Sequence, residues 1–103
     1  MTRGDICWTE LPEGGRRPVL VLTRAEAIPV LRQVIVAPLT KTIRGIPTEV
    51  RLGKDDGMPA ECVISFDNVQ ATSRRLLGNP IVSLSGARMH EVCRALAIAT
   101  GCD

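Results

Sequence analysis

The most informative stretch of the chain is Gly14-Gly15-Arg16-Arg17-Pro18-Val19-Leu20-Val21-Leu22-Thr23. The diglycine is flexible and the proline restricts the backbone, so the chain direction is set where an apolar, buried-type strand begins. The two arginines are thereby placed at the start of that strand. Because guanidinium groups stay charged and bind two phosphate oxygens at once, the stretch predicts a loop that faces phosphate.

A second stretch of the same kind follows further along the chain. Gly45-Ile46-Pro47-Thr48 leads into Glu49-Val50-Arg51-Leu52, where polar and apolar residues alternate as in a half-buried strand. The functional question that the sequence raises is whether Arg17 and Thr48 face one cleft.

Length and composition indicate one small globular domain over residues 1–103. Hydrophobic residues make up 45% of the chain, too many for a disordered protein. Aromatic residues make up only 2%, which disfavours a surface on which several nucleic-acid bases stack. The net charge of +2, from 13 basic and 11 acidic residues, is too mild to indicate nucleic-acid binding by itself. A chain this short is only marginally stable alone, so dimerisation is expected to help.

The positions of the basic residues are better evidence for nucleic-acid binding than their number is. Several fall in or beside predicted loops and strand ends, although any one of them alone is most simply a solvated surface residue. They are Arg16, Arg17, Lys41, Arg44, Arg74 and Arg75.

The cysteines indicate reduced thiols rather than a metal site. Cys7, Cys62, Cys93 and Cys102 form neither a CxxC pair nor a cluster with histidine, so no zinc site is expected. No signal peptide and no membrane-spanning run is recognised, which predicts a cytoplasmic protein. We expect Cys7 and Cys62 to be small core residues and Cys102 to be exposed.

Short apolar runs between Gly, Pro and charged residues predict a β-rich domain. We expect strands at residues 5–10, 18–23, 33–37, 48–52, 62–66, 68–73 and 81–84, with a helical turn or loop at 24–28, a basic loop at 39–46 and a turn at 53–57. These amount to roughly five to seven strands of a small open barrel.

The end of the chain predicts one α-helix. Ser85 is a suitable N-cap and Gly101 a natural stop. An apolar stripe recurs at three- and four-residue steps and should pack on the barrel. His90 lies beside the stripe, which favours a surface histidine over a catalytic one. The stripe comprises Met89, Val92, Cys93, Leu96 and Thr100.

Five short motifs follow one another in a characteristic order. They are Arg3-Gly4-Asp5-Ile6-Cys7-Trp8, then Gly15-Arg16-Arg17-Pro18-Val19-Leu20-Val21-Leu22, Val36-Ala37-Pro38-Leu39-Thr40, Ile46-Pro47-Thr48-Glu49-Val50 and Phe66-Asp67-Asn68-Val69-Gln70. With the closing helix, this series resembles the MazF/PemK family of toxin endoribonucleases over nearly the whole chain.

The resemblance implies an SH3-like open barrel with a C-terminal helix, and a homodimer. It implies a type II toxin that cleaves single-stranded RNA at short sequences without a metal or other cofactor. Messenger RNA is the implied substrate, with ribosomal or transfer RNA as alternatives. It also implies a cognate antitoxin whose acidic, disordered tail fills the RNA groove.

The chemistry of such a reaction can be stated independently. The ribose 2′-OH attacks its own phosphate, which requires a proton acceptor for that hydroxyl, a donor for the departing 5′-oxygen and positive donors around the phosphorane. The expected products carry a 2′,3′-cyclic phosphate and a 5′-OH. DNA lacks the nucleophile and can only bind or inhibit.

The resemblance assigns catalytic roles to particular residues. Arg17 matches the family's arginine before proline and would stabilise the phosphorane, while Thr48 matches its catalytic Thr/Ser position and would hold a phosphate oxygen. The ordinary alternatives are a surface ion pair for Arg17 and a strand-start residue for Thr48. The first loop is shorter than in many members, and Glu13 is the sole carboxylate left near Arg17. Glu13 is therefore either the proton acceptor or a partner of Arg16.

Recognition of RNA is expected from polar side chains on the loops. Lys41 and Arg44 suit phosphates, and Arg16 is a backbone-positioning or ion-paired neighbour of Arg17. Asn68 is either a base-reading residue or simply a turn residue. The full predicted set comprises Arg16, Thr40, Lys41, Arg44, Asn68 and Gln70.

Two other functions are compatible with the same barrel. A gyrase inhibitor of the CcdB type would need a tryptophan-containing C-terminal tail, whereas this chain ends Thr100-Gly101-Cys102-Asp103. A non-catalytic SH3-like binding module is disfavoured by the low aromatic content.

Overall fold

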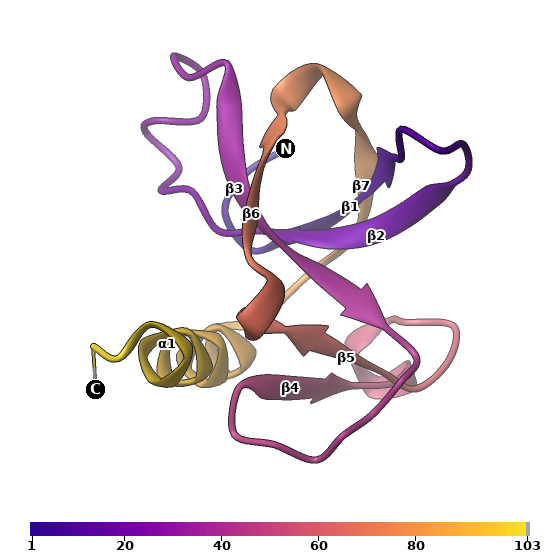
Figure 1. The fold of residues 1–103 in the computed structure, drawn as a ribbon, viewed down its shortest axis with the longest axis vertical. Helices are drawn as coiled ribbons and strands as arrows, with labels where there is room; N and C mark the ends of the chain where they lie inside the picture. Colours follow the sequence, from indigo (N-terminus) through magenta and orange to yellow (C-terminus); the bar gives the residue numbers. More distant parts are fainter. Residues whose placement is uncertain (103) are drawn as a thin grey trace.

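The computed structural model describes residues 1–102, which fold into an antiparallel β-structure carrying one C-terminal helix (Figure 1). The strand order is β4-β5-β3-β2-β1-β7, with β6 also paired to β3, and the sheet is not closed into a barrel. The expected mainly-β fold with a terminal helix is confirmed. The strands are β1 (Asp5–Glu10), β2 (Arg16–Val21), β3 (Gln33–Thr40), β4 (Glu49–Leu52), β5 (Cys62–Ser65), β6 (Gln70–Ser73) and β7 (Leu77–Ser83). The helix is α1 (Gly86–Thr100), and three single-turn 3₁₀ helices are η1 (Lys54–Asp56), η2 (Phe66–Asn68) and η3 (Arg74–Leu76).

Strand β3 joins the two halves of the molecule and crosses between them in Figure 1. Its first half pairs with β2 and β6, whereas Leu39 and Thr40 at its end pair with Ile64 and Val63 of β5. The predicted loop over 39–46 was therefore wrong at its first two residues. Leu39 is buried, so the strand continues past Pro38 to place that side chain in the core.

The apolar run after Pro18 is explained by burial on both faces of β2. Val19 and Val21 pack with Val34 and Val36 in one cluster, while Leu20 faces a second cluster with side chains from β4, β5 and α1. A strand covered on both sides carries a continuous hydrophobic sequence instead of an alternating one. The strand begins at Arg16, so the two arginines lie within it and not in the loop before it.

The C-terminal helix begins and ends where the sequence predicts. The Ser85 hydroxyl accepts a hydrogen bond of 3.2 Å from the Arg88 N–H, and Gly101 closes the helix at φ +72°. Val92 and Ala95 are buried against the sheet, whereas Cys93 is exposed. The predicted stripe was thus wrong at Cys93 and at Thr100, which is also exposed.

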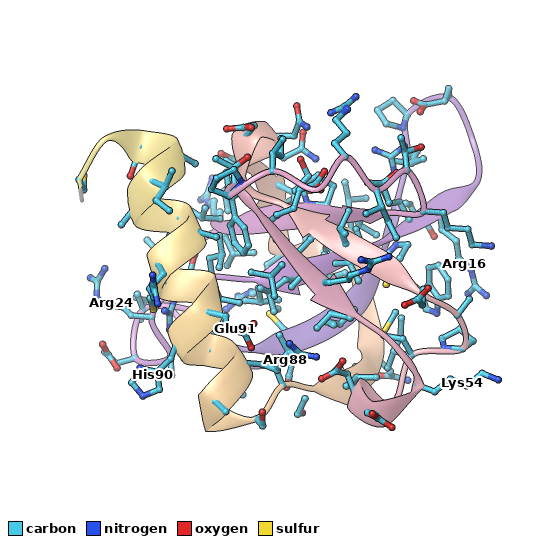
Figure 2. All side chains as sticks on the ribbon, turned by 90° about the horizontal axis from the view of Figure 1, so that it is seen from below. Arg16, Arg24, Lys54, Arg88, His90 and Glu91 are labelled. Carbon is cyan, nitrogen blue, oxygen red and sulfur yellow. The ribbon has the colours of Figure 1, made fainter. Side chains whose placement is uncertain are left out.

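A bidentate ion pair fastens the helix to the turn after β4. The Arg88 Nε and one Nη donate to the Asp56 carboxylate at 2.8 and 3.1 Å, and the other Nη binds Glu91. Figure 2 shows Arg88 and Glu91 together on the helix and His90 at its outer side. His90 is exposed, as predicted.

The remaining boundaries differ modestly from expectation. Strand β7 starts at Leu77, four positions before the predicted Ile81, and Asn68 belongs to η2 instead of a strand. Cys7 and Cys62 are buried and Cys102 is exposed, as predicted. Among the helices of residues 1–102, none is long and apolar enough to cross a membrane.

Candidate functional site

A polar groove of about 570 Å³ opens where β2, the end of β3 and η2 meet. It gathers residues from three separate stretches of sequence, and each stretch carries at least one predicted catalytic or RNA-binding side chain. The lining residues are Arg17, Pro38, Thr40, Thr42, Arg44, Ser65, Asp67, Asn68, Val69 and Gln70.

Arg17 contributes an uncompensated positive charge to this groove. It is exposed, and within the described chain no carboxylate lies within 4.0 Å of its guanidinium and no hydrogen bond holds it. The surface ion-pair alternative is thus not what the structure contains. An arginine free of internal partners keeps its planar fork available for phosphate oxygens.

Thr48 reaches the groove through an acidic partner. Its hydroxyl donates a hydrogen bond of 2.6 Å to the Asp67 carboxylate, and Asp67 lines the groove. The backbone reinforces the pairing, because the Phe66 N–H donates to the Thr48 carbonyl at 3.0 Å. Thr48 does not itself line the groove, and Asp67 lies between it and the open space that Arg17 also lines.

The neighbouring loop is tied down by a second carboxylate. One Glu49 oxygen accepts hydrogen bonds from the backbone N–H groups of Arg44 and Gly45 at 3.1 and 3.0 Å. This contact holds the segment that carries Arg44 beside the groove. On the other wall, the Asn68 side-chain amide donates to Ser65 Oγ at 2.8 Å, which fixes η2.

The structure brings together most of the predicted RNA-binding residues. Thr40, Arg44, Asn68 and Gln70 all line the groove with Arg17. The other two predicted RNA-binding residues, Arg16 and Lys41, and the catalytic candidates Glu13 and Thr48 are not part of this lining. Glu13 is exposed in the turn between β1 and β2, Arg16 lies over the Trp8 ring at 4.3 Å, and Lys41 lines a neighbouring apolar pocket.

Asp67 lines the groove and binds Thr48, but it is not among the site residues predicted from the sequence. Its segment, Phe66-Asp67-Asn68, was part of the motif series, but nothing local links it to Thr48. The link arises because β4 and β5 pair antiparallel with Glu49 opposite Ser65, which sets the residues just beyond each strand side by side.

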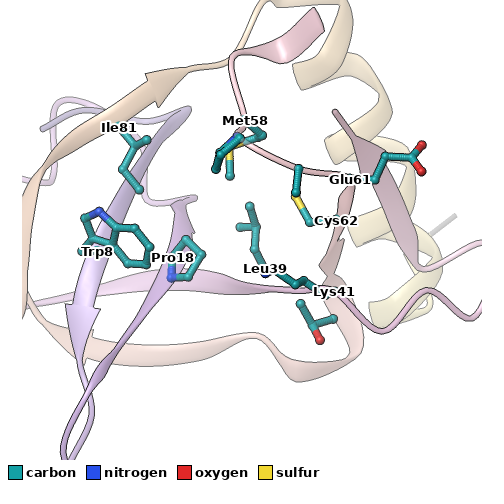
Figure 3. A pocket seen from close by; sticks show the side chains of 11 residues that line it. Trp8, Pro18, Leu39, Lys41, Met58, Glu61, Cys62 and Ile81 are labelled. Atoms are coloured by element: carbon teal, nitrogen blue, oxygen red, sulfur yellow. The ribbon is translucent and has the colours of Figure 1, made fainter. Parts of the chain in front are cut away.

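The apolar pocket beside the groove has a volume of about 310 Å³. Thr40 lines both spaces, so they adjoin. Figure 3 shows Trp8, Pro18 and Ile81 on one side of it, with Met58 and Cys62 facing them. Burial raises the pKa of the Cys62 thiol, which therefore stays protonated and apolar at neutral pH.

Within residues 1–102, no three His, Cys, Asp or Glu side chains gather closely enough to hold a metal ion. The groove presents the Asp67 carboxylate, which the Thr48 hydroxyl binds, and the Arg17 guanidinium. Such a set can accept a proton and stabilise an anionic phosphorane.

Comparison with known proteins agrees with this geometry. Residues 2–100 match the family described as PemK-like, MazF-like toxins of type II toxin–antitoxin systems. The chain is 44% identical to the probable endoribonuclease MazF5 of Mycobacterium tuberculosis over 98% of this chain and 94% of that protein. It is 41% identical to the probable endoribonuclease MazF2 of the same species over 99% of this chain and all of that protein.

Two solved structures share the fold. The Mycobacterium tuberculosis toxin MazF-mt6 superposes with a TM-score of 0.88 at 35% identity, covering 96% of this chain and 98% of that one. A mycobacterial endoribonuclease in complex with its cognate antitoxin gives a TM-score of 0.89 at 27% identity, covering 100% and 97%. This chain belongs to the PemK/MazF family of type II toxin–antitoxin toxins.

Proposed function

We propose that this protein is the toxin of a type II toxin–antitoxin system and a metal-independent endoribonuclease that cuts single-stranded RNA. The observation that carries the proposal is the polar groove lined by both the unpaired Arg17 guanidinium and Asp67, whose carboxylate the Thr48 hydroxyl binds. The relatives named endoribonuclease support the same activity.

Asp67 is the side chain best placed to accept the proton of the ribose 2′-OH. It lines the groove, and one of its oxygens is oriented by the Thr48 hydroxyl at 2.6 Å while the other remains available. Glu13, for which the sequence left open the roles of acceptor and of partner to Arg16, lies in the exposed β1–β2 turn outside this lining. We therefore transfer the acceptor role from Glu13 to Asp67.

Arg17 is assigned to the charge that develops on the phosphate. Attack of the 2′-oxygen places additional negative charge on the equatorial oxygens and on the departing 5′-oxygen, and a guanidinium donates to both. Deprotonation of a guanidinium is costly, so stabilisation is its main role, and water in the open groove supplies the proton that the 5′-oxygen takes as it leaves. The predicted contact of Thr48 with a phosphate oxygen would require its hydroxyl to turn away from Asp67.

The rest of the groove suits an extended polyanion. Arg44 supplies a second cation for a backbone phosphate, and Asn68 and Gln70 supply donors and acceptors for splayed bases. The requirement for a 2′-OH restricts cleavage to RNA. The same cationic groove is suited to an acidic antitoxin tail, and one structural relative was solved with its cognate antitoxin.

The active form is proposed to be a cytoplasmic homodimer. Ile35 on β3 is 48% exposed, and Val30 and Leu31 before that strand are 79% and 41% exposed. Such neighbouring apolar side chains are typical of a surface that a second copy covers. Sedimentation at micromolar concentration tests this, because a species of 11.1 kDa alone would contradict a dimer.

The activity is tested with a purified protein and a defined single-stranded RNA in excess EDTA. We expect fragments that end in 2′,3′-cyclic phosphate and begin with 5′-OH, and no cutting of the DNA of the same sequence. Intact RNA, or an Arg17→Ala variant that cuts as fast as wild type, would refute the proposal. No observation favours the CcdB-like gyrase inhibitor or the non-catalytic module.

A further inference from the structure

The groove continues into two further cavities that the proposed reaction does not use. The apolar pocket adjoins the groove at Thr40 and ends at Trp8. Beyond Trp8 lies a smaller cavity of about 280 Å³, the arginine pocket, which shares that ring. Six of its lining residues matter here: Trp8, Thr9, Glu10, Arg16, Arg75 and Gly78.

The arginine pocket carries two cations without acidic partners. The Arg16 guanidinium stacks on the Trp8 ring at 4.3 Å, and Arg75 is exposed in η3. Glu10 is the only acid of the lining, and it lies beyond 4.0 Å of both guanidinium groups. The remaining positive charge suits an anion held between the two arginines.

A buried polar atom in the same pocket lacks a partner. Thr9 is 3% exposed, and its hydroxyl has no hydrogen bond to any described residue. Unsatisfied buried hydroxyls are uncommon because they lose their bonds to water without replacement. That hydroxyl is itself closed to solvent, so the case for a ligand rests on the two free arginines and the Trp8 ring.

We propose that Trp8, Arg16 and Arg75 form a nucleotide subsite of the RNA substrate, outside the catalytic groove. One base enters the apolar pocket against Trp8 and Pro18, and the adjacent phosphate binds Arg16 and Arg75. This inference rests on the proposed RNA-cleaving function.

Single-stranded RNA fits this sequence of surfaces better than other ligands. It alternates flat, largely apolar bases with anionic phosphates, and the cavities alternate in the same way: cationic around Arg17, apolar between Thr40 and Trp8, and cationic around Arg16. Every base can stack on an aromatic ring. We therefore expect the subsite to require a nucleotide at the right distance from the catalytic groove and to select little between bases.

The protein carries its own reporter for this subsite. Trp8 is the single tryptophan of a chain without tyrosine, so intrinsic fluorescence reports on this pocket alone. The probes are 2′-O-methyl oligonucleotides, which lack the free 2′-OH and are not cut. We expect quenching by a long oligonucleotide, little by a dinucleotide, and recovery when an abasic nucleotide replaces the base that reaches Trp8.

Substitution of Arg75 provides the second measurement. Arg75→Gln should weaken binding of the long oligonucleotide by about tenfold and reduce the slope of log affinity against log salt by about 0.7, the loss of one phosphate contact. It should raise KM for a long RNA and leave kcat unchanged. Arg94→Gln is the matched control, since Arg94 is exposed on α1 and lines neither the groove nor these two pockets.

The outcomes separate this subsite from the proposed function. If wild type cuts RNA while Trp8 fluorescence ignores the long oligonucleotide and Arg75→Gln matches Arg94→Gln, the subsite is refuted and the nuclease stands. If quenching occurs but no RNA is ever cut, the nuclease is refuted and the binding subsite stands. Quenching by an acidic peptide with none by the oligonucleotide assigns the pocket to a protein partner and overturns the inference.

Discussion

The Thr48 hydroxyl and the Asp67 carboxylate are joined by a 2.6 Å hydrogen bond across 19 positions of sequence. The bond places a carboxylate at the wall of the groove that Arg17 also lines. The proposed general base and the proposed electrostatic stabiliser thus share one space, and they provide two of the three groups that cleavage through the 2′-OH requires.

Asp67→Asn tests the proton acceptor. Asparagine keeps the shape of the side chain but cannot take a proton, so we expect RNA cleavage to slow by about 10²–10⁴-fold. Single-turnover cleavage with saturating enzyme measures the chemical step. The matched control is Asp55→Asn, a change at an exposed residue of η1 that lies outside the groove. Equal rates for the two variants would exclude Asp67 as the base.

Glu13→Gln tests the acceptor that the sequence alone suggested. Because Glu13 is exposed in the β1–β2 turn and does not line the groove, we expect its loss to change cleavage by less than about threefold, a range normal for surface changes. The same single-turnover assay applies. A loss comparable to that of Asp67→Asn would return the role to Glu13.

Paired substitutions at Thr48 separate its hydroxyl from its shape. Thr48→Val removes the bond to Asp67 while keeping the branched side chain, and we expect cleavage to fall by about 10–100-fold, since a bond to a charged group contributes about 1.5–3 kcal/mol. Thr48→Ser keeps the hydroxyl and should retain most activity. Similar losses in both variants would show that packing, not the hydroxyl, matters at this position.

Arg17 should be irreplaceable by another cation. Arg17→Ala is expected to lower cleavage by about 10²–10³-fold, and Arg17→Lys should recover only part of it, because lysine lacks the planar fork. Arg24→Ala is the control, since Arg24 is a solvent-exposed residue paired with Glu26 away from the groove. Full activity of Arg17→Lys would reduce the role of Arg17 to simple charge.

Acid should loosen the attachment of α1 to η1. The hydrogen bonds from Arg88 lower the pKa of Asp56 below its usual value. The stabilisation is therefore complete above the unfolded-state pKa near 3.8 and is lost as pH falls through the lower folded-state value. Asp56→Asn should cost about 1–2 kcal/mol at pH 7, toward the lower end for charged pairs because Arg88 is 31% exposed.

Urea unfolding of wild type and Asp56→Asn at pH 7 and at pH 2.5 checks this prediction. The difference between the two proteins should shrink at the lower pH. A difference that is unchanged by acid would show that the Asp56–Arg88 pair contributes no pH-dependent stability.

The sequence predicted those helices and strands whose ends or burial depend on residues within the same segment. Ser85 and Gly101 mark the ends of α1, because capping depends on residues adjacent in sequence. The Val-Leu-Val-Leu run marks β2, since only a strand covered on both faces is apolar at successive positions. The end of β3 was missed because Pro38 suggested a break, while the burial of Leu39 extends the strand.

Two adjacent arginines have side chains in different places, which their predicted position in a loop did not indicate. Arg16 and Arg17 both lie within β2, where successive side chains point to opposite faces. Arg17 therefore enters the groove while Arg16 stacks on Trp8. The alternation follows from strand geometry, but it applies only once the strand is known to begin at Arg16.

The family and the mainly-β fold with its terminal helix follow from the sequence alone, because they depend on local patterns and on an ordered series of motifs, which also made Arg17 and Thr48 candidates. The carboxylate that we propose to act with them could be found only in the folded chain. Glu13 is near Arg17 in sequence but lies in an exposed turn, whereas antiparallel pairing of β4 with β5 sets Asp67 against Thr48. Strand register is a long-range property, so no local pattern encodes that contact.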